Sequence, residues 1–98
     1  MAKVFYPLGN LTRLVDATCG PNAHPDETKY RIAIGTEIWN EGNPLVLKIQ
    51  MVYKDTGIQG RRSPSFPLGS DDFCRVQAAA TELLQAAAES GLRGNVRT

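Results

Sequence analysis

Apolar residues recur at every second position of the segment LVLKIQMVYK, residues 45–54. This apolar set consists of Leu45, Leu47, Ile49, Met51 and Tyr53. The positions between them form a mixed set of Val46, Lys48, Gln50, Val52 and Lys54. Because successive side chains of a strand point to opposite faces of a sheet, the pattern predicts a half-buried antiparallel strand.

The segment before it, YRIAIGTEIW at residues 30–39, alternates in the same way. One face would carry Tyr30, Ile32 and Ile34, with Arg31 on the other face. Glycine inside a strand often marks a bulge. If Gly35 introduces none, Ile38 continues the first set and Trp39 the second. The turn-like segment NEGNP, residues 40–44, separates the two predicted strands.

The C-terminal part follows a helical period instead. Its apolar positions are Phe73, Val76, Ala80, Leu83, Leu84 and Ala87. Ser70 stands before Asp71 and Asp72, a pattern typical of an N-cap followed by acids that the helix dipole favours. Gly91 supplies the stop. The pattern predicts one amphipathic helix over residues 70–90, and Cys74 within it is expected to be a small core residue.

The remaining segments complete an α+β domain of residues 1–98. Residues 1–28 would hold a hairpin or a bent strand around PLGN, followed by a loop that contains His24. Residues 29–69 would form an antiparallel sheet whose last strand is short and confined to an edge by nearby prolines. The fold as a whole is expected to be a curved antiparallel sheet of about four strands, and residues 1–28 would either complete this sheet or lie across it. The helix at 70–90 and a tail at 91–98 follow.

Composition narrows the class of protein only slightly. The 98 residues carry a net charge of +1, so the overall charge does not indicate a nucleic-acid-binding protein. Between residues 45 and 67, however, Lys48, Lys54, Arg61 and Arg62 face a single acid, Asp55. No signal peptide or membrane-spanning apolar run is visible, and cysteine usage fits a reduced compartment, so we expect a cytoplasmic protein without membrane contact.

Sequence motifs for catalysis are missing. The chain has no GxSxG, no P-loop and no GxGxxG. Cys19 and Cys74 with a single histidine make no zinc set. We therefore expect no enzyme activity, no cofactor and no metal. A small enzyme or ligand-binding protein that uses His24 is the weakest hypothesis, because no cluster of partners accompanies this histidine in the sequence.

Aromatic and basic residues on the predicted strands favour binding of single-stranded nucleic acid. Aromatic rings on a sheet can stack on unpaired bases, and nearby cations can neutralise phosphates. The predicted binding residues are Trp39, Tyr53, Arg31, Lys48, Lys54, Arg61 and Arg62. The alternative for Trp39 and Tyr53 is an ordinary place in the core or at its rim.

From about residue 30 to residue 84 the chain resembles the transcriptional positive cofactor four family, in particular its small bacterial and phage members. The resemblance is carried by IWN at 38–40, LVLKIQMVYKD at 45–55, GRR at 60–62, FPLGSDDF at 66–73 and the amphipathic helix. It implies a curved sheet, one C-terminal helix, a homodimer formed through that helix, and binding of single-stranded DNA or RNA.

By position, the resemblance implies that Trp39 and Tyr53 stack on bases, with Arg61 and Arg62 near the basic turn of the family. Two departures stand out. The segment SPSFP replaces the usual turn after the basic residues, and Gln50 stands where the family often has an arginine. Tyr53 shares the Leu47 face, so that stacking beside Trp39 requires a twist or a bulge near the strand end.

Binding of single strands fits a transcription cofactor or a replication or repair accessory. The alternative is a protein-interaction module of the same fold, which contacts the transcription machinery through its sheet or an edge strand without nucleic-acid binding.

Overall fold

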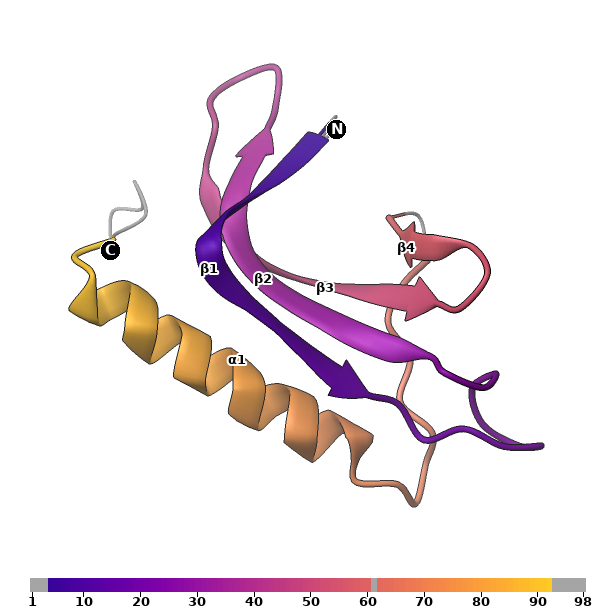
Figure 1. The fold of residues 1–98 in the computed structure, drawn as a ribbon. Coiled ribbons are helices and arrows are strands. Elements are labelled where there is room, and N and C mark those ends of the chain that lie inside the picture. Colours follow the sequence, from indigo (N-terminus) through magenta and orange to yellow (C-terminus); the bar gives the residue numbers. More distant parts are fainter. Residues whose placement is uncertain (1–3, 61, 93–98) are drawn as a thin grey trace.

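The computed structural model describes residues 4–60 and 62–92. Within these residues the elements are β1 (Val4–Asp16), β2 (Lys29–Ile38), β3 (Leu45–Tyr53), β4 (Gly57–Gln59) and α1 (Asp72–Glu89). The described strands form one antiparallel sheet in the order β1-β2-β3-β4, and α1 follows it (Figure 1). The predicted α+β arrangement of a four-stranded sheet and a C-terminal helix is confirmed.

β1 is a single bent strand rather than a hairpin. Its pairing with β2 shifts between Pro7, which lies opposite Gly35, and Thr12, which lies opposite Ala33. Residues 8–11 thus lie opposite Ile34 alone. The extra residues bend β1 sharply at this point, as bulges do, and the sheet curves with it (Figure 1).

Gly35 is required where β1 bends against β2. A Cβ at this position would lie 2.2 Å from the backbone oxygen of Tyr6 and 2.7 Å from the Cα of Pro7. β2 itself pairs with β3 without interruption from Lys29 to Thr36, so the irregularity lies in β1 rather than at Gly35. The glycine allows two backbones to approach closely, which is a role of glycine inside strands.

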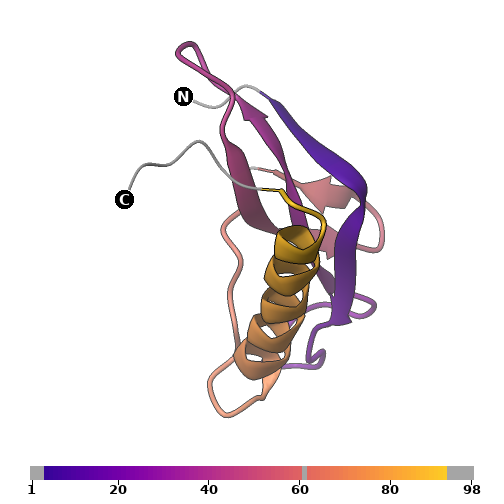
Figure 2. The ribbon, with the colours of Figure 1, turned by 90° about the vertical axis from the view of Figure 1, so that its left-hand side faces the viewer.

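The helix α1 lies along the outer, convex face of the curved sheet (Figures 1 and 2). It packs on β1 and β2 and leaves the concave face uncovered. The core between sheet and helix is formed by the buried side chains Leu11, Tyr30, Ile32, Ile34, Met51, Val76, Ala79, Leu83 and Ala87. Tyr30, Ile32 and Ile34 occupy one face of their strand, as predicted from the alternation.

Three details of the predicted helix are wrong. The N-cap is Asp71, because Ser70 lies one residue too early and its hydroxyl donates to the carbonyl oxygen of Pro67 at 2.6 Å. Phe73 and Leu84 are 53% and 56% exposed, so the helical face that α1 buries is narrower than the apolar pattern suggests. Cys74 is exposed rather than packed in the core. No helix among the described residues is long and apolar enough to cross a membrane.

Candidate nucleic-acid interface

The concave face of the sheet carries the side chains that point away from α1. In β2 and β3 these are the positions between the core residues, because directly paired residues share a face. Arg31 lies opposite Gln50 there, and its guanidinium donates to the Gln50 side-chain oxygen at 3.3 Å. Gln50 stands where the positive cofactor four family often has an arginine. In this structure its side chain is buried and accepts a hydrogen bond from Arg31.

A second group on this face surrounds Glu37. The Lys48 ammonium donates to Glu37 Oε2 at 2.6 Å and lies 5.4 Å from the centroid of the Phe5 ring. Phe5 is directly paired with Glu37 across β1 and β2. The ammonium of Lys48 lowers the pKa of Glu37 against the opposing effect of burial, so this carboxylate is charged at neutral pH.

Trp39 lies just beyond the end of β2 and belongs to the same group. Its indole N–H donates to Glu37 Oε1 at 2.8 Å, and its backbone N–H donates to the carbonyl oxygen of Gly42 at 3.2 Å. The side chain is 38% exposed, so it is oriented by a bond at one edge while part of the indole faces solvent. We call Phe5, Arg31, Glu37, Trp39 and Lys48 the open-face cluster.

Tyr53 does not join the open-face cluster. β3 keeps its register with β2 up to Val52, and Tyr53 stays on the face of Met51, packed against the edge of the core. The Arg62 guanidinium lies 5.7 Å from the centroid of the Tyr53 ring. The predicted site is thus divided between Trp39 on the concave face and Tyr53 with Arg62 on the other side, at the opposite end of β3.

Both lysines of the predicted site are paired with acids of the same chain. Lys48 is bound to Glu37, and the Lys54 ammonium lies 2.9 Å from Glu27. Lys29, which also lies on the concave face, forms an ion pair with Asp16. The pairs of Lys29 and Lys54 are largely exposed, so that each is weak and open to exchange with another anion. The pair of Lys48 is better protected, because the Glu37 side chain is only 13% exposed.

The predicted arginines differ from the lysines in this respect. Among the described residues, neither Arg31 nor Arg62 has a carboxylate within ion-pair distance. Arg61 lies outside the described residues. The guanidinium groups of Arg31 and Arg62 are therefore the predicted cations best placed to take an external anion.

The sequence did not indicate a buried polar network at the start of α1. Asp72 is fully buried and accepts hydrogen bonds from the backbone N–H of Thr18 at 2.9 Å and its hydroxyl at 2.6 Å. The Tyr30 hydroxyl donates to Asp72 Oδ2 and Arg75 donates to Oδ1, both at 2.7 Å. His24, also buried, bonds the carbonyl oxygen of Ser65 at 2.8 Å.

The hydrogen bonds of this network hold Asp72 in its charged form. Burial acts to raise the pKa of Asp72, but the bonds from Thr18, Tyr30 and Arg75 together lower it to about 2. Burial and the bond to Asp72 raise the pKa of Tyr30. Within the described residues, no buried side-chain polar atom lacks a partner, and no group of three or more His, Cys, Asp or Glu side chains could hold a metal ion.

Comparison of the chain with protein-family models, with curated proteins and with solved structures found no match. The resemblance to the positive cofactor four family therefore depends only on the residues given for it above.

Proposed function

We propose that the protein is a non-catalytic single-stranded nucleic-acid-binding protein and that its binding surface is the concave face of the sheet. The observation that carries the proposal is the part-exposed indole of Trp39, which Glu37 orients on a face that α1 leaves uncovered. Because the hydrogen bond to Glu37 already fixes the orientation of the ring, stacking on a base would cost little additional side-chain entropy. Base–aromatic stacking contributes about 1–3 kcal/mol per base and accepts any base.

Other members of the open-face cluster support the proposal. Phe5 supplies a second ring, and Lys48 and Arg31 supply cations along the same face. A phosphate that took the Lys48 ammonium from Glu37 would leave this mostly buried carboxylate without its cation, so the gain from Lys48 is small. We therefore propose that stacking contributes more to affinity than charge does, with DNA or RNA as the ligand.

The direct test compares a mixed-sequence oligonucleotide as a single strand and as a duplex. We expect tighter binding of the single strand, because only unpaired bases expose their faces to Trp39 and Phe5. The logarithm of the binding constant should fall with the logarithm of salt concentration, by roughly 0.7 per phosphate contact. Fluorescence anisotropy of a labelled strand measures both quantities. Equal affinity for duplex and single strand would count against stacking.

We further propose that the protein is a homodimer joined beside α1. The helix packs on β1 and β2, and it leaves Leu45, Leu47 and Ile49 of β3 only partly buried. A cavity of about 130 Å³ there is lined by Ile34, Leu45, Val46, Leu47, Leu84, Ala87 and Leu92. A second copy would cover this apolar strip with the same strip of its own surface.

Sedimentation equilibrium tests the homodimer. The wild-type protein should show twice the chain mass, and Leu84→Glu should shift it toward the chain mass, because Leu84 is 56% exposed and a charge there would have to be buried on association. Glu82→Lys, at an exposed position of α1 outside the strip, is the matched control. A chain mass for the wild-type protein at high concentration would contradict the proposal.

A protein-interaction module of the same fold is the second candidate function. It is favoured by the near-neutral charge and by the ion pairs that occupy Lys29, Lys48 and Lys54. Its partner would be a component of the transcription machinery in the cytoplasm. Capture of such a component without salt-sensitive retention of nucleic acid would support this function over the first.

A further inference from the structure

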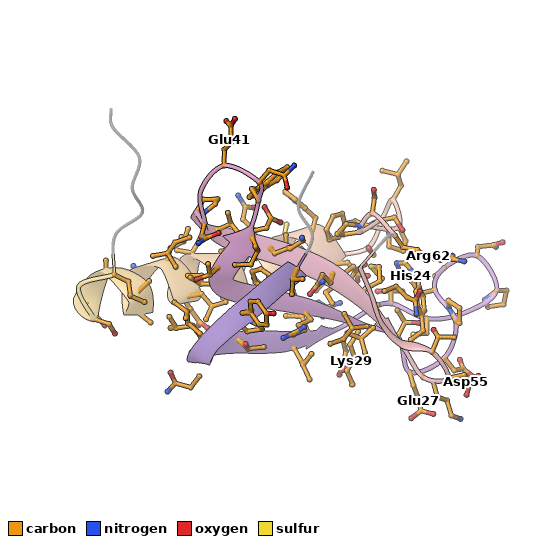
Figure 3. All side chains as sticks on the ribbon, turned by 90° about the horizontal axis from the view of Figure 1, so that it is seen from above. His24, Glu27, Lys29, Glu41, Asp55 and Arg62 are labelled. Atoms are coloured by element: carbon orange, nitrogen blue, oxygen red, sulfur yellow. The ribbon has the colours of Figure 1, made fainter. Side chains whose placement is uncertain are left out.

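A second hollow lies at the end of the sheet remote from Trp39, between the loop at Pro25 and the turn that joins β3 to β4. Its volume is about 510 Å³, within the usual range of roughly 300–1,000 Å³ for small-molecule sites. The residues that matter for its chemistry are Asp26, Tyr53, Asp55, Thr56, Gln59 and Arg62. Figure 3 shows Asp55 and Arg62 at this end of the molecule, far from Glu41 in the turn between β2 and β3.

The Tyr53 ring provides the aromatic wall of the cavity. The ring packs against the edge of the core, which fixes its orientation. The Arg62 guanidinium also lines the cavity and lies 5.7 Å from the centroid of the Tyr53 ring. A planar heterocycle in the cavity can stack on Tyr53, and Arg62 is placed to contact a group attached to that heterocycle.

The polar groups around the ring have opposite charges. Asp26 and Asp55 are exposed carboxylates, and neither has an ion-pair partner among the described residues. An ionised carboxylate only accepts hydrogen bonds and can accept two parallel ones. Arg62 only donates, in a fork that suits phosphate. Lys54 is bound to Glu27 and therefore contributes less to anion binding.

A ligand that satisfies all three features has a flat ring, an edge with adjacent N–H donors, and an anionic group. Guanine has such an edge at N1–H and its 2-amino group, whereas adenine presents a ring acceptor next to its amino group and would repel a carboxylate. A cationic amine ligand fits less well, because the Arg62 guanidinium beside Tyr53 would repel a second positive charge.

We propose that this cavity binds a single guanine nucleotide, with the base on Tyr53, its N–H edge on Asp26 or Asp55, and its phosphate on Arg62. Two sources offer this chemistry: a free nucleotide and the terminal nucleotide of a bound strand. The second source rests on the proposed function, and the first does not.

Calorimetric titration with GMP, AMP, guanosine and inorganic phosphate tests the proposal. GMP should bind at least about tenfold more tightly than AMP, because a charge-assisted pair of hydrogen bonds is worth roughly 1.5–3 kcal/mol. Arg62→Gln should weaken GMP about tenfold and leave guanosine unchanged. Tyr53→Leu, which keeps an apolar side chain against the core, should weaken both ligands.

The matched control is Arg13→Gln. Arg13 is an exposed arginine of β1 whose guanidinium bonds only to backbone oxygens among the described residues, and its loss should leave GMP binding unchanged. Circular dichroism confirms that each variant is folded. Equal binding of GMP and AMP, or no binding of GMP to the folded wild-type protein, would overturn the proposal.

Oligonucleotides that carry their only guanine at an end or in the middle separate the two sources. Tighter binding of the oligonucleotide with the terminal guanine supports the strand end as the ligand, provided that Tyr53→Leu removes the difference. Binding of GMP without any difference between the two oligonucleotides supports the free nucleotide. If the protein binds GMP but no oligonucleotide, the cavity proposal stands and the proposed function fails. If the protein binds oligonucleotides but not GMP, the proposed function stands and the cavity proposal fails.

Discussion

Asp72→Asn is expected to lower the free energy of unfolding by about 3 kcal/mol, the lower end of the range for removal of one partner of a buried charged pair, because Arg75 is 37% exposed. The Asp72 carboxylate is fully buried and accepts four hydrogen bonds, from the N–H and hydroxyl of Thr18, the hydroxyl of Tyr30 and the guanidinium of Arg75. An amide has one oxygen acceptor in place of two, so donors of Thr18 or Arg75 would lose their partner.

Urea denaturation followed by circular dichroism measures this change. The matched control is Asp71→Asn at the preceding residue, whose carboxylate is 71% exposed and bonds only Arg75 among the described residues. We expect the control to cost less than about 1 kcal/mol, as for other exposed ion pairs. Similar losses for the two variants would show that the buried network does not hold the start of α1.

The same carboxylate predicts how stability depends on pH. Its pKa is lowered from 3.8 to about 2 in the folded protein, so the folded state favours the charged form. The resulting stability is fully present above pH 5 and is lost as the pH falls toward 2. It amounts to about 2 kcal/mol, from 1.36 kcal/mol per pKa unit. The Asp72→Asn variant has no carboxylate at this position, so its free energy of unfolding should fall less than that of the wild-type protein between pH 5 and pH 2.

Trp39→Ala is expected to weaken binding of a single-stranded oligonucleotide by about tenfold or more, the equivalent of one stacked base. The indole is the largest exposed ring of the open-face cluster and is oriented by Glu37. Lys48→Ala should cost less, because Lys48 is already paired with Glu37 and gains little from a phosphate. Anisotropy titrations of the two variants and the wild-type protein give the comparison.

Tyr6→Ala is the matched control for Trp39→Ala. Tyr6 is 57% exposed and pairs with Thr36, so it lies on the side of β1 opposite to Phe5. Removing this ring should leave oligonucleotide affinity unchanged within a factor of about two. If Tyr6→Ala weakened binding as much as Trp39→Ala does, the concave face would not be the binding surface.

Alternation was sufficient to predict β2, β3 and the face that each strand buries. The period of two is a local property, and the core of Tyr30, Ile32 and Met51 follows it. Alternation also shows why Trp39 and Tyr53 could not share a surface. Tyr53 follows the core positions of its strand, and the uninterrupted register of β3 with β2 leaves no bulge to redirect it.

The bend of β1 and the network at Asp72 could not be predicted in this way. Both depend on contacts between residues far apart in the chain. Gly35 meets the backbone of Tyr6 and Pro7, Thr18 meets Asp72, and His24 meets Ser65. An acid at a helix start resembles an ordinary dipole partner, and only the fold reveals that Asp72 is buried.

Titration of the protein with an unlabelled single strand, followed by Trp39 fluorescence, tests the proposed function most directly. Trp39 is the only tryptophan of the chain, so its emission reports this site alone. We expect saturable quenching at low salt that added salt weakens and that is much smaller with the duplex. An emission spectrum that stays unchanged while anisotropy shows the strand to be bound would contradict it.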